Sequence, residues 1–353
     1  MTTVVNVVGA RPQFIKAGPI SKALARAGVK ELLVHTGQHY DPLMSARIMA
    51  DIGLREPDVN LGVGSASHAV QTARILEKME SLLEEHRPDA VLVYGDTNST
   101  LGGALAASKL GIPIAHVEAG MRSFNKAMPE EVNRIVTDHV SDLLFAATDT
   151  AMGHLTREGL AARASHTGDV MVDALRSVDF TSELPNWAQD DYYVATIHRA
   201  ENTEDKARLR AVIEALDRLD HPVHLLAHPR LMKMLEQWGI DPKEGALVVR
   251  PPSGYGEILA AVNRSKGLFT DSGGLQKEAF ILRVPCVTIR TETEWPETLA
   301  GGWNVLASPD EDLTSLARRR IEDLDNEPFG DGHAAERAVS VLEERVEAGP
   351  GMD

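Results

Sequence analysis

The chain has 353 residues, of which 43% are hydrophobic and 25% charged, as in globular proteins with enough length for two domains. Its formal net charge of −16 argues against a nucleic-acid partner, because such binding depends on a basic surface. No apolar run approaches the roughly 18–20 residues that span a bilayer, and no signal-peptide pattern opens the chain. The single cysteine, Cys286, cannot form an internal disulfide. These features predict a cytoplasmic protein without a membrane or nucleic-acid partner.

Apolar runs alternate with helical patterns through the first half of the chain. Buried strands are predicted at about residues 4–8, 32–36, 90–94, 114–117 and 143–147. Helices are predicted at about 16–27, 42–52, 66–86, 99–110 and 129–140. Such alternation predicts a parallel sheet covered by helices on both faces.

The polar stretch 178–191 breaks this rhythm, and the alternation then restarts. Strands are predicted at about 192–197, 223–227, 246–250, 267–270 and 285–289, and helices at about 203–219, 230–238, 255–265, 273–282 and 310–322. We therefore expect an α/β protein of two Rossmann-like domains, residues 1–177 and 192–332, joined by a linker at 178–191. A last helix at 333–350 follows a Gly-rich break, and the sequence leaves open whether it packs back on the first domain.

Carboxylates follow two predicted strands of the first half. Asp96 comes after strand 90–94 and Glu118 after strand 114–117, with Glu130 and Glu131 further on. Neighbouring parallel strands end at one edge of a sheet, where ligands bind. The pattern predicts a proton-handling centre, although Asp96 could instead cap the following helix.

Cations lie at the ends of the first strand of each half. Arg11 and Lys16 stand in the turn and first helical turn of G-A-R-P-Q-F-I-K, and His198 and Arg199 end strand 192–197. Cations are unfavourable near a helix amino terminus, so this placement predicts a bound anion, with solvent exposure as the alternative. The turn lacks G-x-G-x-x-G, and no acidic residue ends the second strand, which disfavours a nicotinamide cofactor.

The segment T-D-S-G-G-L-Q-K-E-A, residues 270–279, joins a strand to a helix. Ser272 can cap that helix, and Gly273 and Gly274 let a ligand approach the free N–H groups, which bind phosphate. Glu278, about one turn inside, suits a ribose diol. The sequence contains no cysteine cluster, and no His-x-x-x-His or His-Glu-x-x-His spacing falls on a predicted helix, so we expect no metal site.

Six motifs occur here in one order: G-A-R-P-Q-F-I-K, Y-G-D-T-N-S-T, H-V-E-A-G-M-R-S, M-P-E-E-V-N-R, T-x-H-R-x-E-N and D-S-G-G-L-Q-K-E-A. From about residue 5 to about 305, the chain resembles the non-hydrolysing UDP-N-acetylglucosamine 2-epimerases. The resemblance implies two Rossmann-like domains facing across a cleft (a GT-B-like fold), a homodimer, no cofactor, and a place in polysaccharide or aminosugar biosynthesis.

The resemblance also implies the reaction. A base removes the proton on carbon 2 of the sugar while UDP leaves carbon 1. The proton then returns to the other face of the glycal, and UDP re-adds, giving UDP-N-acetylmannosamine. By motif position, the resemblance assigns proton transfer to Asp96, Glu118 and Glu130, the diphosphate to Arg11, Lys16 and His198, phosphate to Ser272, Gly273 and Gly274, and ribose to Glu278. His198 counts as catalytic because it neutralises the departing diphosphate.

The chain departs from the family pattern at three places. Trp295 stands where many members have an arginine. Gln38-His39-Tyr40-Asp41 and G-S-A-S-H replace elements of a second UDP-sugar site, so we do not expect activation by substrate as in the regulated members. Near the uracil, Tyr255 takes over part of the work of an absent Phe and Gln.

Three alternatives to this function stay open. The G-S-x-S-H and T-E-W-P-E variants resemble a branch that epimerises diacetamido-uronic acid nucleotides, so a modified UDP-2-acetamido sugar is one alternative substrate. A GT-B-fold glycosyltransferase is the second alternative. A UDP-sugar-binding regulator is the third, and the acids at 96, 118 and 130 argue against it.

Overall fold

The structure, a computed structural model, describes residues 2–38, 49, 52–241 and 245–348. Most of the helix expected at about 42–52 lies outside these ranges. Residues 39–41, part of the segment that replaces an element of the second UDP-sugar site, also lie outside them. The chain divides into two compact units, the first made of Met1–Ser177 and Glu327–Asp353 and the second of Val178–Asn326. Among the described residues, no helix is long and apolar enough to cross a membrane.

The first unit is built on a parallel sheet that, within the described residues, has seven strands in the order β3-β2-β1-β4-β5-β6-β7. This is the Rossmann order: the chain adds β2 and β3 on one side of β1 and then continues with β4 on the other side. The strands are β1 (Thr3–Val8), β2 (Lys30–His35), β3 (Val59–Asn60), β4 (Ala90–Tyr94), β5 (Ile114–Ala119), β6 (Leu143–Ala146) and β7 (Ala164–His166). The short strands β3 and β7 have no apolar run long enough to predict them from sequence.

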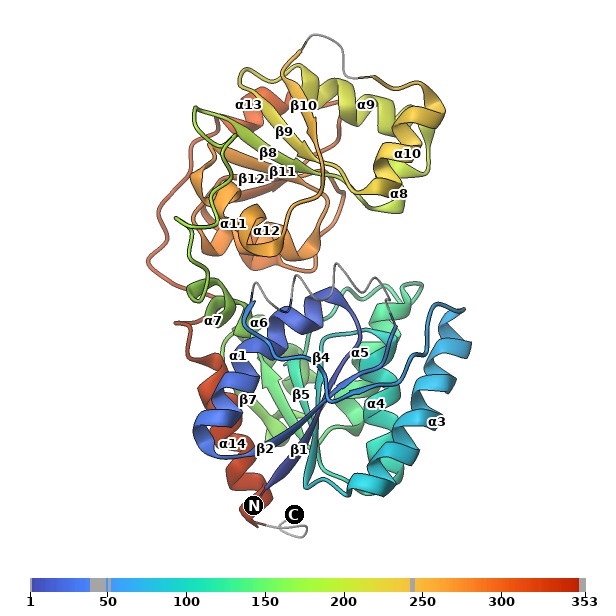
Figure 1. The fold of residues 1–353 in the computed structure, drawn as a ribbon. Helices are drawn as coiled ribbons and strands as arrows, with labels where there is room; N and C mark the ends of the chain where they lie inside the picture. The colour runs from blue at the N-terminus through green and yellow to red at the C-terminus, as the bar shows by residue number, and fades with distance from the viewer. Residues whose placement is uncertain (1, 39–48, 50–51, 242–244, 349–353) are drawn as a thin grey trace. The chain divides into compact units, whose positions relative to one another are not determined.

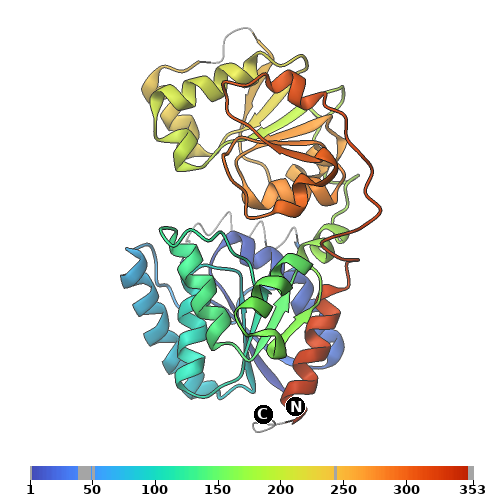
Figure 2. The ribbon, with the colours of Figure 1, turned by 180° about the vertical axis from the view of Figure 1, so that it is seen from behind.

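Helices cover both faces of this sheet, as Figures 1 and 2 show. They are α1 (Arg11–Ala27), α3 (His68–His86), α4 (Asn98–Lys109), α5 (Pro129–Val140), α6 (Asp149–Arg157), α7 (Val170–Arg176) and α14 (Ala334–Ala348), with a 3-10 turn at Ala161–Arg163.

Helix α1 begins earlier than the sequence predicts. Pro12 lies in its first turn, and Oε1 of Gln13 accepts hydrogen bonds from the backbone N–H groups of Gly9 (2.8 Å) and Ala10 (3.0 Å). These contacts stabilise the start of the helix at Arg11. The expected positions of the two cations along the helix were therefore wrong: Arg11 is the first residue of the helix, and Lys16 lies in its second turn.

The last helix, α14, packs against α1 and α7 of the first unit (Figures 1 and 2). The carboxylate of Asp173 on α7 accepts hydrogen bonds from the backbone N–H groups of Ala334 (3.2 Å) and Ala335 (3.0 Å), the first two residues of α14. The chain thus returns to its first unit, and the change of unit lies at Glu327 rather than at the residue 333 expected from the sequence.

The second unit repeats the Rossmann order with six strands among its described residues, β10-β9-β8-β11-β12-β13, all parallel. The strands are β8 (Tyr193–Thr196), β9 (Val223–Leu226), β10 (Leu247–Arg250), β11 (Gly267–Thr270), β12 (Cys286–Thr288) and β13 (Asn304–Leu306). The helices are α8 (Ala200–Thr203), α9 (Lys206–Asp217), α10 (Pro229–Trp238), α11 (Tyr255–Arg264), α12 (Gly273–Ile281) and α13 (Leu313–Ala317), with a 3-10 segment at Pro296–Gly302. The predicted α/β class with two Rossmann-like units is confirmed.

Two stretches of the second unit differ from the sequence-based expectation. The helix expected at 310–322 spans only Leu313–Ala317. Beyond its end, the Arg319 side chain donates to the carbonyls of Cys286 (2.9 Å) and Trp303 (2.8 Å). The polar stretch 178–191 belongs to this unit. Its Trp187 packs on His224 of β9, with the two ring centroids 4.4 Å apart.

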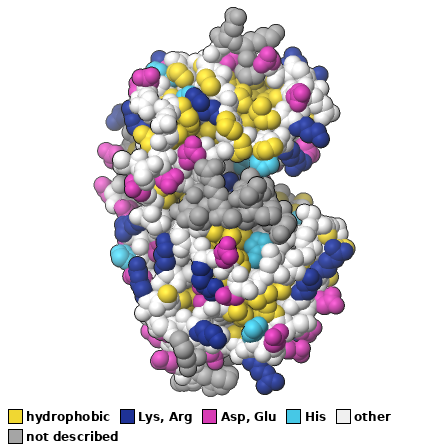
Figure 3. Space-filling model, viewed as in Figure 1, with side chains coloured by type: hydrophobic (Ala, Val, Ile, Leu, Met, Phe, Trp, Pro, Cys, Tyr) yellow, Lys and Arg dark blue, Asp and Glu magenta, His cyan; other side chains and the backbone are white. Residues whose placement is uncertain are grey.

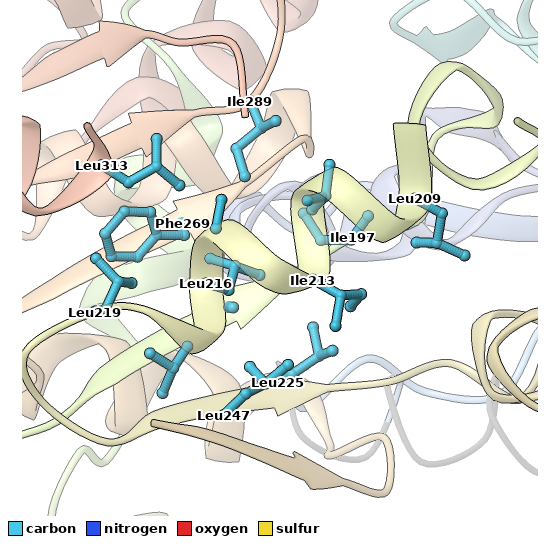
Figure 4. Close-up of a cluster of buried hydrophobic side chains, with 14 of the residues drawn as sticks. Ile197, Leu209, Ile213, Leu216, Leu219, Leu225, Leu247, Phe269, Ile289 and Leu313 are labelled. Atoms are coloured by element: carbon cyan, nitrogen blue, oxygen red, sulfur yellow. The ribbon is translucent and has the colours of Figure 1, made fainter. Parts of the chain in front are cut away.

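The core of the second unit lies between α9 and its sheet (Figure 4). Leu209, Ile213 and Leu216 recur at helical spacing and face the sheet residues Leu225 and Phe269. On the face of the molecule in Figure 3, charged side chains of both signs are interspersed with small apolar areas.

Candidate active site

Glu118 stands at an irregular end of β5. The pairing of β5 with β6 shifts register between Val117 and Ala119, so Glu118 is the extra residue of a β-bulge. Its φ of 69° is in the left-handed region, which costs a non-glycine residue about 1–2 kcal/mol. Such strain persists only where the surroundings enforce it, and it is most common at functional positions.

The carboxylate of Glu118 forms an ion pair with Nζ of Lys16 on α1, and the two side chains are only 9% and 10% exposed. Gly95, after β4, makes room for this pair. A Cβ on Gly95 would lie 3.2 Å from Oε2 of Glu118 and 3.4 Å from Nζ of Lys16. The end of β4, the end of β5 and helix α1 therefore meet at one point.

Asp96 does not cap helix α4, so that alternative was wrong. The N-cap is Thr97, whose Oγ1 accepts a hydrogen bond from the Thr100 N–H at 3.3 Å. The side chain of Asp96, 35% exposed, forms an ion pair with Arg134 on α5, which is 7% exposed. Asp96 thus pairs with a buried cation, as Glu118 does.

The two adjacent glutamates at the start of α5 differ in their surroundings. Glu131 is buried and accepts hydrogen bonds from the N–H groups of Ser123 (2.9 Å) and Phe124 (2.9 Å). Burial raises the pKa of Glu131, but these bonds and the charge of Arg134 outweigh it and hold the pKa below its ordinary value. Glu130 is partly exposed and forms no hydrogen bond or ion pair with the described residues. Glu131 therefore holds the loop after β5, whereas Glu130 is not held in this way.

Arg11 is exposed and pairs with none of the described residues, while Lys16 is 8% exposed and bound to Glu118. Of the two cations predicted to bind an anion, the structure therefore places Lys16 against one of the acids, Glu118.

In the second unit, His198 is held by Asp271. The Asp271 carboxylate accepts hydrogen bonds from Nδ1 of His198 (3.0 Å) and from the backbone N–H groups of His198 (3.0 Å) and Arg199 (3.0 Å). Burial raises the pKa of Asp271, but the hydrogen bond and charge of His198 outweigh it, so the pKa lies below its ordinary value. Asp271 fixes the orientation of an imidazole whose side chain is 52% exposed.

The amino end of α12 has the predicted capped form. Oγ of Ser272 accepts a hydrogen bond from the Leu275 N–H at 3.3 Å. A Cβ on Gly273 would lie 2.1 Å from Oε1 of Glu294, whereas a Cβ on Gly274 would meet no atom within 4 Å. Gly274 therefore opens onto space at the helix start, where an anion can approach the backbone.

Tyr255 and Glu278 come together behind this helix start. The Tyr255 hydroxyl on α11 donates to Oε1 of Glu278 at 2.8 Å, and Glu278 is 5% exposed. Trp295 is 5% exposed, and Nζ of the buried Lys277 lies 3.8 Å from its ring centroid. Such a contact contributes about 2 kcal/mol when desolvated. Where many members of the resembling family have an arginine, this chain thus has Trp295, whose ring contacts the ammonium group of Lys277.

Sequence reasoning assigned no role to Arg134 or Asp271, although both lie inside quoted motifs. Asp271 directly follows β11, which was an available signal, whereas Arg134 lies within α5. Their partners Asp96 and His198 lie 38 and 73 residues away in the chain. Among the described residues, no group of three or more His, Cys, Asp or Glu side chains could hold a metal ion.

By its fold, the chain is of the class built from two Rossmann-like units, with acids at the strand ends of one and a capped helix start in the other. Its residues 22–343 match the family described as UDP-N-acetylglucosamine 2-epimerase, and the chain belongs to that family.

Similar proteins span almost the whole chain. A UDP-N-acetylglucosamine 2-epimerase homolog of Methanococcus maripaludis is 43% identical, covering 96% of this chain and 99% of its own. A UDP-2,3-diacetamido-2,3-dideoxy-D-glucuronate 2-epimerase of Pseudomonas aeruginosa is 44% identical, with the same coverage. The crystal structure of the Methanocaldococcus jannaschii UDP-GlcNAc 2-epimerase in complex with UDP-GlcNAc and UDP superposes with a TM-score of 0.87 at 38% identity, covering 98% of this chain and 100% of that one.

Proposed function

We propose that this chain is an isomerase that interconverts UDP-N-acetylglucosamine and UDP-N-acetylmannosamine by elimination and re-addition of UDP. The observation that carries the proposal is the pair of strand-end acids, Glu118 and Asp96, each bound to a buried cation of the first unit. Membership of the epimerase family supports it.

The reaction needs one group to remove the proton on carbon 2 and another to return it on the opposite face. We assign proton transfer to Asp96, Glu118 and Glu130. Ion pairing can keep a carboxylate ionised as a base, while a neighbouring acid in a different environment stays protonated. The three carboxylates differ in their surroundings: Glu118 pairs with the buried Lys16, Asp96 with the buried Arg134, and Glu130 is partly exposed.

The nucleotide is assigned to the second unit. Ser272, Gly273 and Gly274 bind phosphate through the start of α12, and Glu278 binds the ribose with Tyr255 beside it. Arg11, Lys16 and His198 offset the negative charge that grows on the departing diphosphate. Asp271 keeps the His198 ring in one orientation for that purpose.

A second candidate substrate is a UDP-2,3-diacetamido-2,3-dideoxy-D-glucuronate. The relative named for this sugar is 44% identical to this chain, against 43% for the Methanococcus maripaludis homolog and 38% for the Methanocaldococcus jannaschii enzyme. The chemistry at carbon 2 is the same for both sugars, so the acids above serve either substrate.

Proton NMR of the purified chain in heavy water tests both candidates. With the true substrate, deuterium should appear on carbon 2 in the manno product and in recovered substrate. Product without label would overturn the elimination mechanism, and transfer to an acceptor without exchange would indicate a glycosyltransferase. Running each UDP-sugar separately identifies the substrate.

The remaining features of the proposal are a cytoplasmic homodimer with no cofactor, serving polysaccharide or aminosugar biosynthesis without activation by its own substrate. Analytical ultracentrifugation should give twice the 38.3 kDa chain mass, and a monomer would exclude the dimer. Rate against substrate concentration should be hyperbolic, and a sigmoidal curve would indicate a second UDP-sugar site.

A further inference from the structure

Asp138 on α5 is fully buried and binds both sides of the bulge that carries Glu118. Its carboxylate accepts a hydrogen bond from Nδ1 of His116 at 2.7 Å and from the backbone N–H of Gly120 at 3.1 Å. His116 lies two residues before Glu118, and Gly120 lies two residues after it. One carboxylate therefore holds the backbone on both sides of a residue in a strained conformation.

The same histidine reaches the neighbouring strand end. Nε2 of His116 donates to the carbonyl oxygen of Gly95 at 2.7 Å. Gly95 directly precedes Asp96 and leaves room for the Lys16–Glu118 pair. The path from Asp138 through His116 thus fixes the turn that presents Asp96 as well as the bulge that presents Glu118.

Arg122 balances the buried charge. Its Nη1 lies 2.7 Å from Oδ2 of Asp138, and its Nε and Nη2 donate to the two oxygens of Glu158 at 2.7 and 2.6 Å. Burial raises the pKa of Asp138, but His116 and Arg122 outweigh it and hold the pKa below its ordinary value. Buried ion pairs add little to stability compared with apolar packing, so a fully satisfied one points to a role in fixing geometry.

We propose that Asp138 is a positioning residue for the epimerisation: through His116 and Gly120 it sets the places of Glu118 and Asp96. This inference rests on the proposed function. Asp138 is too deeply buried to meet substrate and acts only through these contacts. A displacement of about 1 Å at a reacting group can cost about 100-fold in rate, so loosening this anchor should slow the chemistry more than it weakens binding.

The test compares Asp138→Asn with Asp142→Asn. Asp142 pins the opposite end of the same strand, because its Oδ2 accepts a hydrogen bond from the Ile114 N–H at 2.9 Å. Both variants remove one carboxylate that anchors β5. We expect Asp138→Asn to lower kcat for carbon 2 exchange about 100-fold while UDP affinity, measured by calorimetry, stays within about threefold. Asp142→Asn should leave kcat within about twofold.

Equal kcat values for the two variants would overturn the inference. The inference would also be wrong if Asp138→Asn lost kcat and UDP binding equally, both in proportion to the fraction of unfolded protein. If Asp138→Asn does not fold, His116→Gln takes its place, with the same expected split between kcat and UDP affinity, and a normal kcat would overturn the inference. A wild-type chain that exchanges carbon 2 of neither UDP-sugar would sink the proposed function and the inference together. An active wild type with an equally active Asp138→Asn would sink the inference alone.

Discussion

Nζ of Lys16 and Oε2 of Glu118 form an ion pair that joins helix α1 to the bulged end of β5, although the residues lie 102 positions apart. Both side chains are about nine-tenths buried. A charge removed from water is costly unless it is paired, so each partner restricts where the other can lie. The first unit thus holds a carboxylate and a cation in a fixed relation before any ligand arrives.

Glu118→Gln should abolish most of the epimerisation. The amide has the same shape but cannot exchange a proton, and general acid–base groups typically contribute about 10²–10⁴-fold in rate. UDP affinity should stay near that of wild type, because Glu118 is not among the residues assigned to UDP. Rate measurements and calorimetry check the two statements, with the exposed Glu77→Gln on α3 as control. Activity within twofold of wild type would remove Glu118 from the mechanism.

Asp96→Asn and Thr97→Ala should separate chemistry from capping. Because Thr97 caps α4, its replacement should lower the free energy of unfolding by about 1 kcal/mol in urea denaturation. Asp96→Asn should instead lower the epimerisation rate by about 10²-fold or more and leave the helix cap intact. The proposal for Asp96 fails if its variant epimerises normally.

Gly95→Ala should damage the site, and Gly111→Ala supplies the matched comparison. Both glycines have positive φ, 60° and 67°, so each alanine pays about 1–2 kcal/mol in backbone strain. Only the new Cβ at 95 approaches the Lys16–Glu118 pair, because a Cβ at 111 would meet no atom within 4 Å. We expect similar losses of stability and a lower kcat for Gly95→Ala alone. Equal kcat values would show that the pair tolerates displacement.

Gly274→Ala should weaken UDP binding without destabilising the fold. Its Cβ enters open space, and alanine favours a helix over glycine by about 0.5–1 kcal/mol. A phosphate at the helix start would meet that methyl group, so UDP affinity should fall about tenfold or more by calorimetry. Unchanged UDP affinity would place the phosphates elsewhere.

Gly273→Ala should lower the stability of the fold, unlike Gly274→Ala. Its Cβ would overlap Oε1 of Glu294, which is held through its other oxygen by Arg290 at 2.8 Å. Overpacking of this kind costs about 1–3 kcal/mol, and urea unfolding would detect it.

Stability should fall between pH 7 and pH 5 partly because of His224. Burial and the charge of Arg250 lower the His224 pKa from 6.5 to about 4, and its Nδ1 accepts a hydrogen bond from Nε of Arg250 at 2.7 Å. The unfolded chain binds a proton below about pH 6.5 and the folded chain does not, so acid favours unfolding in this window. At about 1.4 kcal/mol per pH unit, the loss by pH 5 is at most about 2 kcal/mol.

Urea unfolding of wild type and His224→Gln at both pH values isolates this contribution. Glutamine keeps an acceptor for Arg250 but does not titrate, so its stability should depend less on pH. Identical pH dependence in the two proteins would show that His224 is protonated equally in the folded and unfolded states.

The sequence by itself determined the two Rossmann-like units, the acids at the ends of β4 and β5, and the Ser272 cap. These features depend on local patterns: apolar runs of strand length, helical periodicity between them, and a hydroxyl before a helix. Short strands such as β3 and β7 contain too few residues to show a recognisable pattern. The helix predicted at 310–322 was longer than the observed helix α13, Leu313–Ala317.

Only the tertiary structure decided how the charged groups pair. Whether Asp96 caps α4 or meets Arg134, and whether Lys16 faces solvent or Glu118, depends on which strand ends and helices the sheet brings together. The same holds for Asp138, which lies 22 residues from His116 in the chain and 2.7 Å from it in space. Sequence periodicity reports which side of an element is buried, whereas the partner of a buried charge is set by sheet order and register, which act between distant segments.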